Sequence, residues 1–231
     1  MRLDRFLGKC SGLGHRQARR LLLERRVRVD GAVVCDGLRE IDAFCRIELD
    51  GQLLQAGQPR RYLMLHKPAG HVSATRDAEH PTVLDLLPEA ERAGLHIAGR
   101  LDGNTTGLLL LTNDGLWSRC LTLPGSQLPK VYRVETARPI AAEYVAAFAA
   151  GMYFACEDIV TRPAHLEILG SHSARLTLTE GRYHQVKRMF GRFRNAVVRL
   201  HRESIGSIHL DPALPPGAWR ALRPEEIRQW D

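Results

Sequence analysis

Residues 98–115 read AGRLDGNTTGLLLLTNDG. The four consecutive leucines at 108–111 are too few for an isolated helix, and the run is entered through Gly107 and left at an Asn-Asp-Gly turn. This pattern predicts a short strand that is buried on both faces. Asp102 then lies in the loop that feeds this central strand. A carboxylate in such a place either bonds to local N–H groups, pairs with Arg100, or serves a function.

The surrounding segments alternate between strands and helices. Residues 61–67 and 174–179 have strand patterns, and residues 130–136 alternate so that Tyr132, Val134 and Thr136 share one face. A helix is expected over residues 139–151, between Pro139 and Gly151. We therefore predict an α+β fold for residues 60–231, with a mixed or antiparallel sheet flanked by helices.

The N-terminal segment has the pattern of a separate small domain. Apolar residues at 3, 6, 7 and 10 indicate a first helix, and six arginines against one acid, Glu24, mark a second over residues 14–28. Arg16, Arg19 and Arg20 face away from its buried side, where guanidinium groups suit phosphate oxygens. Asp30-Gly31 predicts a hairpin, a short strand follows near residues 46–49, and residues 52–61 are interpreted as a linker. Residues 1–57 resemble an S4-type RNA-binding module.

Composition favours a polyanionic partner. The 231 residues carry a formal net charge of +7, which suits nucleic acid. Five scattered cysteines without zinc-ligand spacing are expected to be reduced and mostly buried, with no metal site. No segment has the length and apolarity of a membrane span or a signal peptide, so we expect a cytoplasmic protein.

A second basic cluster lies at residues 180–202, EGRYHQVKRMFGRFRNAVVRLHR. Seven Lys or Arg residues accompany a single Glu180, in an order that predicts turn, helix and strand. The inward side of the helix is expected to carry the apolar residues at 186, 189, 190 and 193, which displaces Lys187, Arg188 and Arg192 from the core. Tyr183 and His184 precede the helix, and such rings stack on RNA bases.

Three motifs together resemble those of the RNA pseudouridine synthases. They are GRLDGNTTGLLLLTNDG at 99–115, KVY at 130–132 and EGRYHQVKRM at 180–189. The chain is similar to the RsuA branch, in which an S4 module precedes the catalytic domain, and the likeness covers essentially all 231 residues. Asn104 stands where this family often has an acid, Val131 where it often has threonine, and Gly103 loosens the loop.

The resemblance implies isomerisation of a uridine in 16S rRNA, free or in a small-subunit assembly intermediate, by a monomeric enzyme that needs no cofactor. Asp102 would be the catalytic carboxylate, kept charged by Lys187 or, second, Arg188. Tyr132 would stack on the uracil, unless it is only a core ring, and Arg100 would hold the nucleotide out of its helix. RNA contacts are expected at Arg16, Arg19, Arg20, Arg100, Lys130, His184 and Arg188. The alternatives are the same chemistry on 23S rRNA, a non-catalytic S4-type ribosome assembly protein, and an RNA hydrolase.

Overall fold

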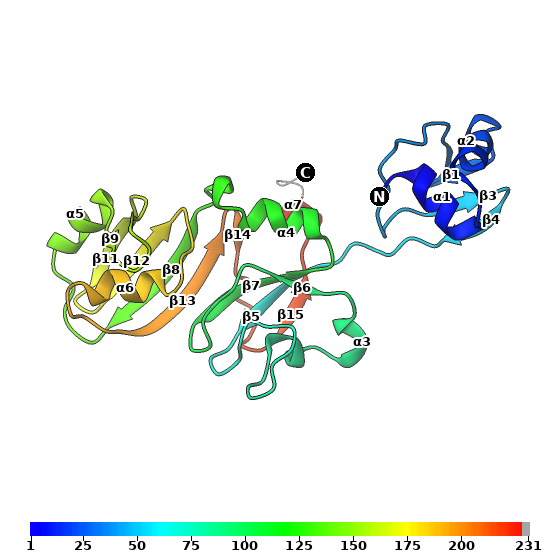
Figure 1. Ribbon diagram of the computed structural model, residues 1–231. Coiled ribbons are helices and arrows are strands. Elements are labelled where there is room, and N and C mark those ends of the chain that lie inside the picture. Colours follow the sequence, from blue (N-terminus) through cyan, green and yellow to red (C-terminus); the bar gives the residue numbers. More distant parts are fainter. Residues whose placement is uncertain (228–231) are drawn as a thin grey trace. The chain divides into compact units, whose positions relative to one another are not determined.

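The computed structural model describes residues 1–227, and the chain divides into two compact units, Met1–Arg60 and Arg61–Asp231. Each unit combines helices and strands around its own core (Figure 1). Within residues 1–227 no helix is both long enough and apolar enough to cross a membrane.

The N-terminal unit packs two helices on a four-stranded sheet of order β2-β1-β3-β4. Asp30 and Gly31 turn the chain between β1 and β2 with φ of 54° and 80°, the left-handed conformation that a tight hairpin needs. The predicted hairpin is thus confirmed. The elements are α1 (Leu3–Ser11), α2 (His15–Leu23), β1 (Val27–Val29), β2 (Ala32–Val33), β3 (Ile47–Leu49) and β4 (Gln52–Gln55).

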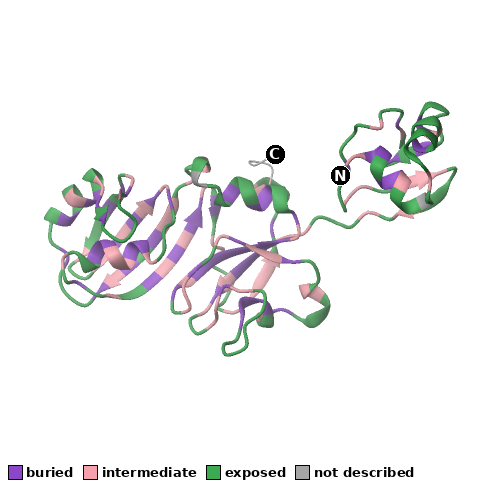
Figure 2. Ribbon diagram, viewed as in Figure 1, coloured by how far each residue is buried: buried purple, intermediate pink, exposed green. Residues whose placement is uncertain are grey.

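Helix α2 presents its arginines to solvent, as predicted. Ala18 and Leu22 are buried, while Arg16, Arg19 and Arg20 are exposed, and Figure 2 shows the outer side of this helix in the exposed colour. The five thiols are free, as predicted, but the prediction that most of them are buried is wrong. Four of the five cysteines are exposed and Cys45 is half-buried, because they lie in loops or on the outer sides of helices rather than on the faces that form the cores.

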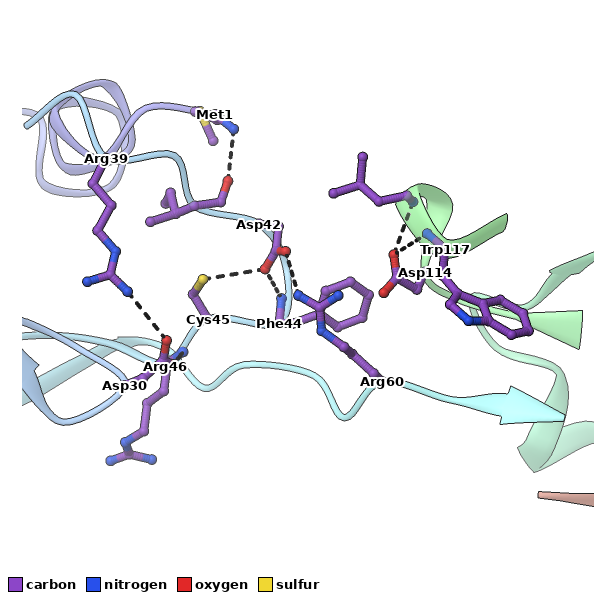
Figure 3. A network of polar contacts seen from close by, with 12 residues as sticks. Met1, Asp30, Arg39, Asp42, Phe44, Cys45, Arg46, Arg60, Asp114 and Trp117 are labelled. Carbon is purple, nitrogen blue, oxygen red and sulfur yellow. Dashed lines mark hydrogen bonds and ion pairs between the residues drawn. The ribbon is translucent and has the colours of Figure 1, made fainter. Parts of the chain in front are cut away.

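The prediction of a linker over residues 52–61 is also wrong in part. Residues 52–55 form β4, which pairs with β3 across the Asp50-Gly51 turn. After β4 the segment stays attached to its own unit. Arg60 donates to the carboxylate of Asp42 at 3.1 Å and lies 4.4 Å above the ring of Phe44, and Asp42 also accepts the backbone N–H of Phe44 (Figure 3).

The larger unit contains a mixed sheet of order β11-β12-β8-β13-β7-β5-β15, with β14 on β13 and β6 on β7. All described pairs are antiparallel except β13 with β7. A separate pair, β9 with β10, stands outside this sheet. The strands are β5 (Tyr62–Lys67), β6 (His96–Ala98), β7 (Thr106–Thr112), β8 (Lys130–Thr136), β9 (Tyr153–Phe154), β10 (Ile159–Val160), β11 (His165–Gly170), β12 (Ser173–Leu178), β13 (Val197–Ile205), β14 (Ile208–His209) and β15 (Trp219–Ala221).

Strand β7 is buried on both faces, which confirms the prediction from its leucine run. Leu109 and Leu111 belong to a core with α5 and α6, whereas Leu108 and Leu110 belong to a second core with α4. The helical elements of this unit are η1 (Val83–Leu86), α3 (Glu89–Arg92), α4 (Gly115–Thr122), η2 (Pro124–Ser126), α5 (Glu143–Ala150), α6 (Gln185–Gly191) and α7 (Pro224–Ile227).

Hydrogen bonds, one set local and one tertiary, decide where two of these helices begin. Asp114 ends the turn after β7 and accepts the backbone N–H groups of Leu116 and Trp117, which caps α4 (Figure 3). Helix α5 begins at Glu143 rather than at Pro139 as predicted. The N–H of Ile140 donates to Ser171 at 2.7 Å, and this tertiary bond holds the segment before α5 in a non-helical path.

Candidate active site

The loop that carries Asp102 is held by its backbone on both sides of that residue. The hydroxyl of Ser73 donates to the Leu101 carbonyl at 2.7 Å and accepts the Leu101 N–H at 3.1 Å. On the other side, the buried ammonium of Lys67 donates to the carbonyls of Gly103 and Thr105 at 2.9 and 2.8 Å. The carboxylate of Asp102 is thereby projected from a rigid loop and keeps 29% of its side chain exposed.

Asp102 meets two basic side chains that lie more than eighty residues away in the chain. The ammonium of Lys187, in the first turn of α6, lies 3.0 Å from Asp102 Oδ2, and His184 Nε2 lies 3.6 Å from Asp102 Oδ1. The structure therefore brings together the acid and the lysine that the sequence singled out.

The segment before α6 is positioned by a buried hydrogen-bond network. Gln185 donates to Glu180 at 2.7 Å, and Glu180 accepts the N–H of Arg162 at 3.0 Å. His184 adopts a left-handed conformation with φ of 50°, and its ring stacks on Tyr183 with centroids 3.9 Å apart. Val186, Met189 and Phe190 are buried on the inner side of α6, which confirms three of the four predicted inward positions and leaves Lys187 directed at Asp102. The fourth, Phe193, lies beyond the end of the helix and is half-buried.

A cavity of about 910 Å³ surrounds these groups. Tyr132 on β8 is 8% exposed and lines the cavity, although it also belongs to the core of the unit. The cavity is lined by six of the residues predicted from sequence, namely Arg100, Asp102, Lys130, Tyr132, His184 and Lys187.

Four other predicted residues lie elsewhere. Arg188 is not among the residues that line the cavity; its guanidinium donates to Glu157 at 2.6 Å and lies 3.7 Å over the ring of Phe154. Arg16, Arg19 and Arg20 belong to the N-terminal unit. Nothing in the structure places RNA against any of these four, and their RNA contacts stay predictions.

Sequence reasoning missed the residues that support the loop from behind. The sequence pattern gives Lys67 only a place at the end of the predicted strand over residues 61–67, yet Lys67 is fully buried beneath the Asp102 loop. Arg202 is also buried, and it donates through Nε to the Leu108 carbonyl at 2.8 Å. A Lys-Pro pair at a strand end and an arginine inside a strand were the available signals, but neither reveals its partners.

Burial lowers the pKa of two lysines, Lys67 behind the Asp102 loop and Lys130 in the wall of the cavity. Loss of hydration lowers the pKa of Lys67 to about 8, with Asp102 opposing and Arg202 adding to this change. Burial, followed by the charge of Arg202, also lowers the pKa of Lys130. Lys130 and Arg202 line the cavity together with Asp102, whereas Lys67 lies behind the Asp102 loop.

This arrangement suits chemistry that uses one ionised carboxylate. Within residues 1–227 there is no group of three or more His, Cys, Asp or Glu side chains that could hold a metal ion. The cavity instead offers Asp102 beside an ammonium, an aromatic ring at Tyr132 and a cationic wall. Such a set fits attack on, or proton removal from, a nucleotide whose base has been turned out of its helix.

Residues 61–191 match the model of the RNA pseudouridylate synthase family, and the chain belongs to that family. Its relatives include proteins named ribosomal small subunit pseudouridine synthase A. The one from Pseudomonas aeruginosa is 65% identical, with 98% of this chain and 99% of the relative covered. The one from Escherichia coli K12 is 44% identical, with 98% of each chain covered. A solved structure of a pseudouridylate synthase superposes with a TM-score of 0.73 and 40% identity over 100% of both chains.

Proposed function

We propose that this protein converts a uridine of 16S rRNA into pseudouridine. The observation that carries the proposal is the pair of Asp102 and Lys187, 3.0 Å apart at the cavity that Tyr132 lines. The target rRNA is supported by full-length relatives whose names specify the small ribosomal subunit.

The reaction breaks the N1–C1′ bond of uridine, turns the uracil while it stays bound, and joins C5 to C1′. Asp102 would add to the sugar, add to the base, or remove a ribose proton. Each of these routes requires the ionised carboxylate. Lys187 would form an ion pair with the Asp102 carboxylate, and the loop bonds from Ser73 and Lys67 would hold that carboxylate in place.

Other side chains of the cavity would bind the nucleotide. Tyr132 would stack on the extracted uracil, and Arg100, which is exposed at the cavity, would occupy the space that the base vacates. Lys130 and His184 would contact the phosphates or bases next to it. Arg188 would act on RNA only where its bond to Glu157 is exchanged for a phosphate.

The test of the chemistry is the Asp102→Asn variant. We expect it to bind 16S rRNA with nearly unchanged affinity but to release no tritium from rRNA that carries C5-tritiated uridine. Asp158→Asn, which changes an exposed carboxylate outside the cavity, is the matched control and should retain full activity. Continued tritium release by Asp102→Asn would refute its catalytic role and favour another group.

The substrate is tested separately with purified 16S and 23S rRNA. Release of tritium from 16S rRNA, or from a small-subunit assembly intermediate, supports the proposal. Release from 23S rRNA alone refutes the target but not the chemistry. Absence of release from every substrate, together with tight rRNA binding, would support a non-catalytic assembly protein instead.

We further propose that the N-terminal unit is an S4-like module that binds rRNA phosphates. The three exposed arginines of α2 support this role. Replacing Arg16, Arg19 and Arg20 by alanine should reduce the slope of log K against log salt by about 2 to 3, since each lost phosphate contact removes about 0.7 to 0.9. The control removes Arg92 and Arg175 of the larger unit, which pair with carboxylates as Arg20 does with Glu24, and it should leave the slope unchanged. An unchanged slope in the triple variant would contradict the role.

We also propose that the protein acts as a monomer in the cytoplasm and without a cofactor. The proposed rRNA substrate supports this location, and the reaction itself, an isomerisation, consumes no second reactant. Sedimentation of the protein alone and with rRNA, in the presence of a chelator, tests the monomer, and tritium release in the same buffer tests the need for a metal.

A further inference from the structure

Arg202 of β13 is a buried guanidinium that the protein itself does not fully satisfy. Its side chain is 2% exposed, with Nε bonded to the Leu108 carbonyl at 2.8 Å and Nη1 to the Arg100 carbonyl at 3.4 Å. Among the described residues, Nη2 has no hydrogen-bond partner and no carboxylate forms an ion pair with this guanidinium. Because an unpaired charge is strongly disfavoured away from water, Arg202 points to a partner outside the chain.

Thr105 gives a second, independent sign of the same partner. It is 1% exposed, and its Oγ1 has no hydrogen-bond partner within the described part of the chain. Thr105 and Arg202 both line the cavity that contains Asp102. Arg202 also lies opposite Tyr132 in the register of β13 and β8. Two unsatisfied polar groups thus adjoin the place where a nucleotide would bind.

The charges of the cavity indicate that this partner gains negative charge. Lys187 already accompanies Asp102, so the cation of Arg202 is in excess of what that carboxylate requires. Lys67 and Lys130 stand close enough for the charge of Arg202 to act on both. A cation beyond those that the carboxylates of the cavity pair with favours a ligand that is anionic or becomes anionic during the reaction.

Uracil becomes such an anion in the proposed reaction, on which this inference rests. When the N1–C1′ bond breaks, its electron pair stays with uracil, and the negative charge spreads over N1, O2 and O4. The sugar is meanwhile bonded to Asp102 or has lost its C2′ proton. C5 then bonds to C1′, and the sugar loses its bond to Asp102 or regains its C2′ proton. The C5 proton leaves and N1 gains a proton. No atom is lost or gained overall.

We propose that Arg202 Nη2 and the hydroxyl of Thr105 bind the carbonyl oxygens of the extracted uracil, and that Arg202 stabilises the charge on the base as N1–C1′ breaks. In this proposal Arg202 and Thr105 are catalytic residues, whereas Lys67 positions the Asp102 loop. An ordered water molecule that satisfies both groups and never meets substrate is the competing explanation.

The first experiment compares Thr105→Val with Thr105→Ser. Valine has nearly the same shape but no hydroxyl, so the free protein should be no less stable, while kcat should fall about 3- to 10-fold, the value of one hydrogen bond. Thr105→Ser keeps a hydroxyl and should have a higher kcat than Thr105→Val. An unchanged kcat in Thr105→Val overturns the contact.

Thr136→Val is the matched control. Thr136 is equally buried on β8, but its hydroxyl already donates to the Arg138 carbonyl at 2.7 Å and lies outside the cavity. This variant should lose stability and keep its kcat, which is the opposite pattern from Thr105→Val.

The second experiment uses Arg202→Lys with short RNA substrates that carry uridine, 2-thiouridine or 4-thiouridine at the target. Sulfur accepts hydrogen bonds poorly, so the native enzyme should convert one thio substrate about tenfold more slowly than uridine. Arg202→Lys should be about 100-fold slower on uridine and should lose that discrimination. Dividing the uridine-to-thiouridine rate ratio of the native enzyme by that of Arg202→Lys cancels any intrinsic effect of sulfur on the reaction.

The results separate the two proposals. A native enzyme that converts no uridine refutes the proposed function itself. In a second outcome, the native enzyme is active while the ratio of its rate on uridine to its rate on each thiouridine equals the ratio for Arg202→Lys. That result refutes only the role of Arg202. If Arg202→Lys does not fold, the Thr105 pair alone decides, because loss of kcat without loss of stability is not expected of a bound water.

Discussion

Gly107, at the start of β7, is a position where the fold of the larger unit leaves no room for a side chain. Its φ is +106°, and a Cβ built there would lie 2.3 Å from the backbone oxygen of Arg202 and 2.6 Å from its nitrogen. These are backbone atoms of the neighbouring parallel strand β13, so no side-chain rotation relieves the contact. Gly107→Ala must separate β7 from β13 directly behind the Asp102 loop.

The expected cost has two parts. The positive φ costs about 1 to 3 kcal/mol for a residue with a side chain, and overpacking at a buried site costs about 1 to 3 kcal/mol more. We therefore expect Gly107→Ala to lower the free energy of unfolding by about 2 to 6 kcal/mol. Because Arg202 moves with β13, tritium release should fall as well.

Urea unfolding followed by tryptophan fluorescence measures this change. The three tryptophans, at positions 117, 219 and 230, all follow residue 60, so the signal reports on the larger unit alone. Gly115→Ala is the control, since a Cβ at this first residue of α4 would meet nothing within 4 Å among the described atoms. A Gly107→Ala protein that is within about 1 kcal/mol of the native one and fully active would refute the reasoning.

Three further predictions concern charged groups of the same unit. Between the lowered pKa of about 8 and the ordinary 10.5, Lys67 should be largely protonated in the unfolded chain and largely neutral in the folded one. The free energy of unfolding should therefore rise with pH over this interval, by up to about 3 kcal/mol relative to Lys67→Met. Equal pH dependence of stability in the two proteins would contradict this prediction. Asp114→Ala should cost about 1 to 2 kcal/mol through loss of the α4 cap, whereas Asp114→Asn should cost less in the same urea assay. Lys187→Met should change stability by less than about 1 kcal/mol, because its pair with Asp102 is partly exposed, yet it should abolish tritium release.

Much of the site was accessible from the sequence because its signals are local. The leucine run and the turns around it predict β7 and place Asp102 just before it, and the 3.6-residue period of residues 186–190 predicts which side of α6 is buried. The alternation in β8 likewise predicts that Tyr132 and Val134 share the buried face. Each of these inferences depends on neighbours within a few residues.

The sequence by itself thus predicted β7, β8 and α6, the buried face of each, and the candidate side chains for the chemistry. Only the tertiary structure decided that β13 runs parallel to β7, that β4 joins the small sheet, and that Lys67 and Arg202 lie under the Asp102 loop. These features depend on hydrogen bonds between residues far apart in the chain, as between Arg202 and Leu108, 94 positions apart. A polar side chain has the same local pattern whether it faces water or a buried carbonyl, so its partner is defined only when the strands have packed.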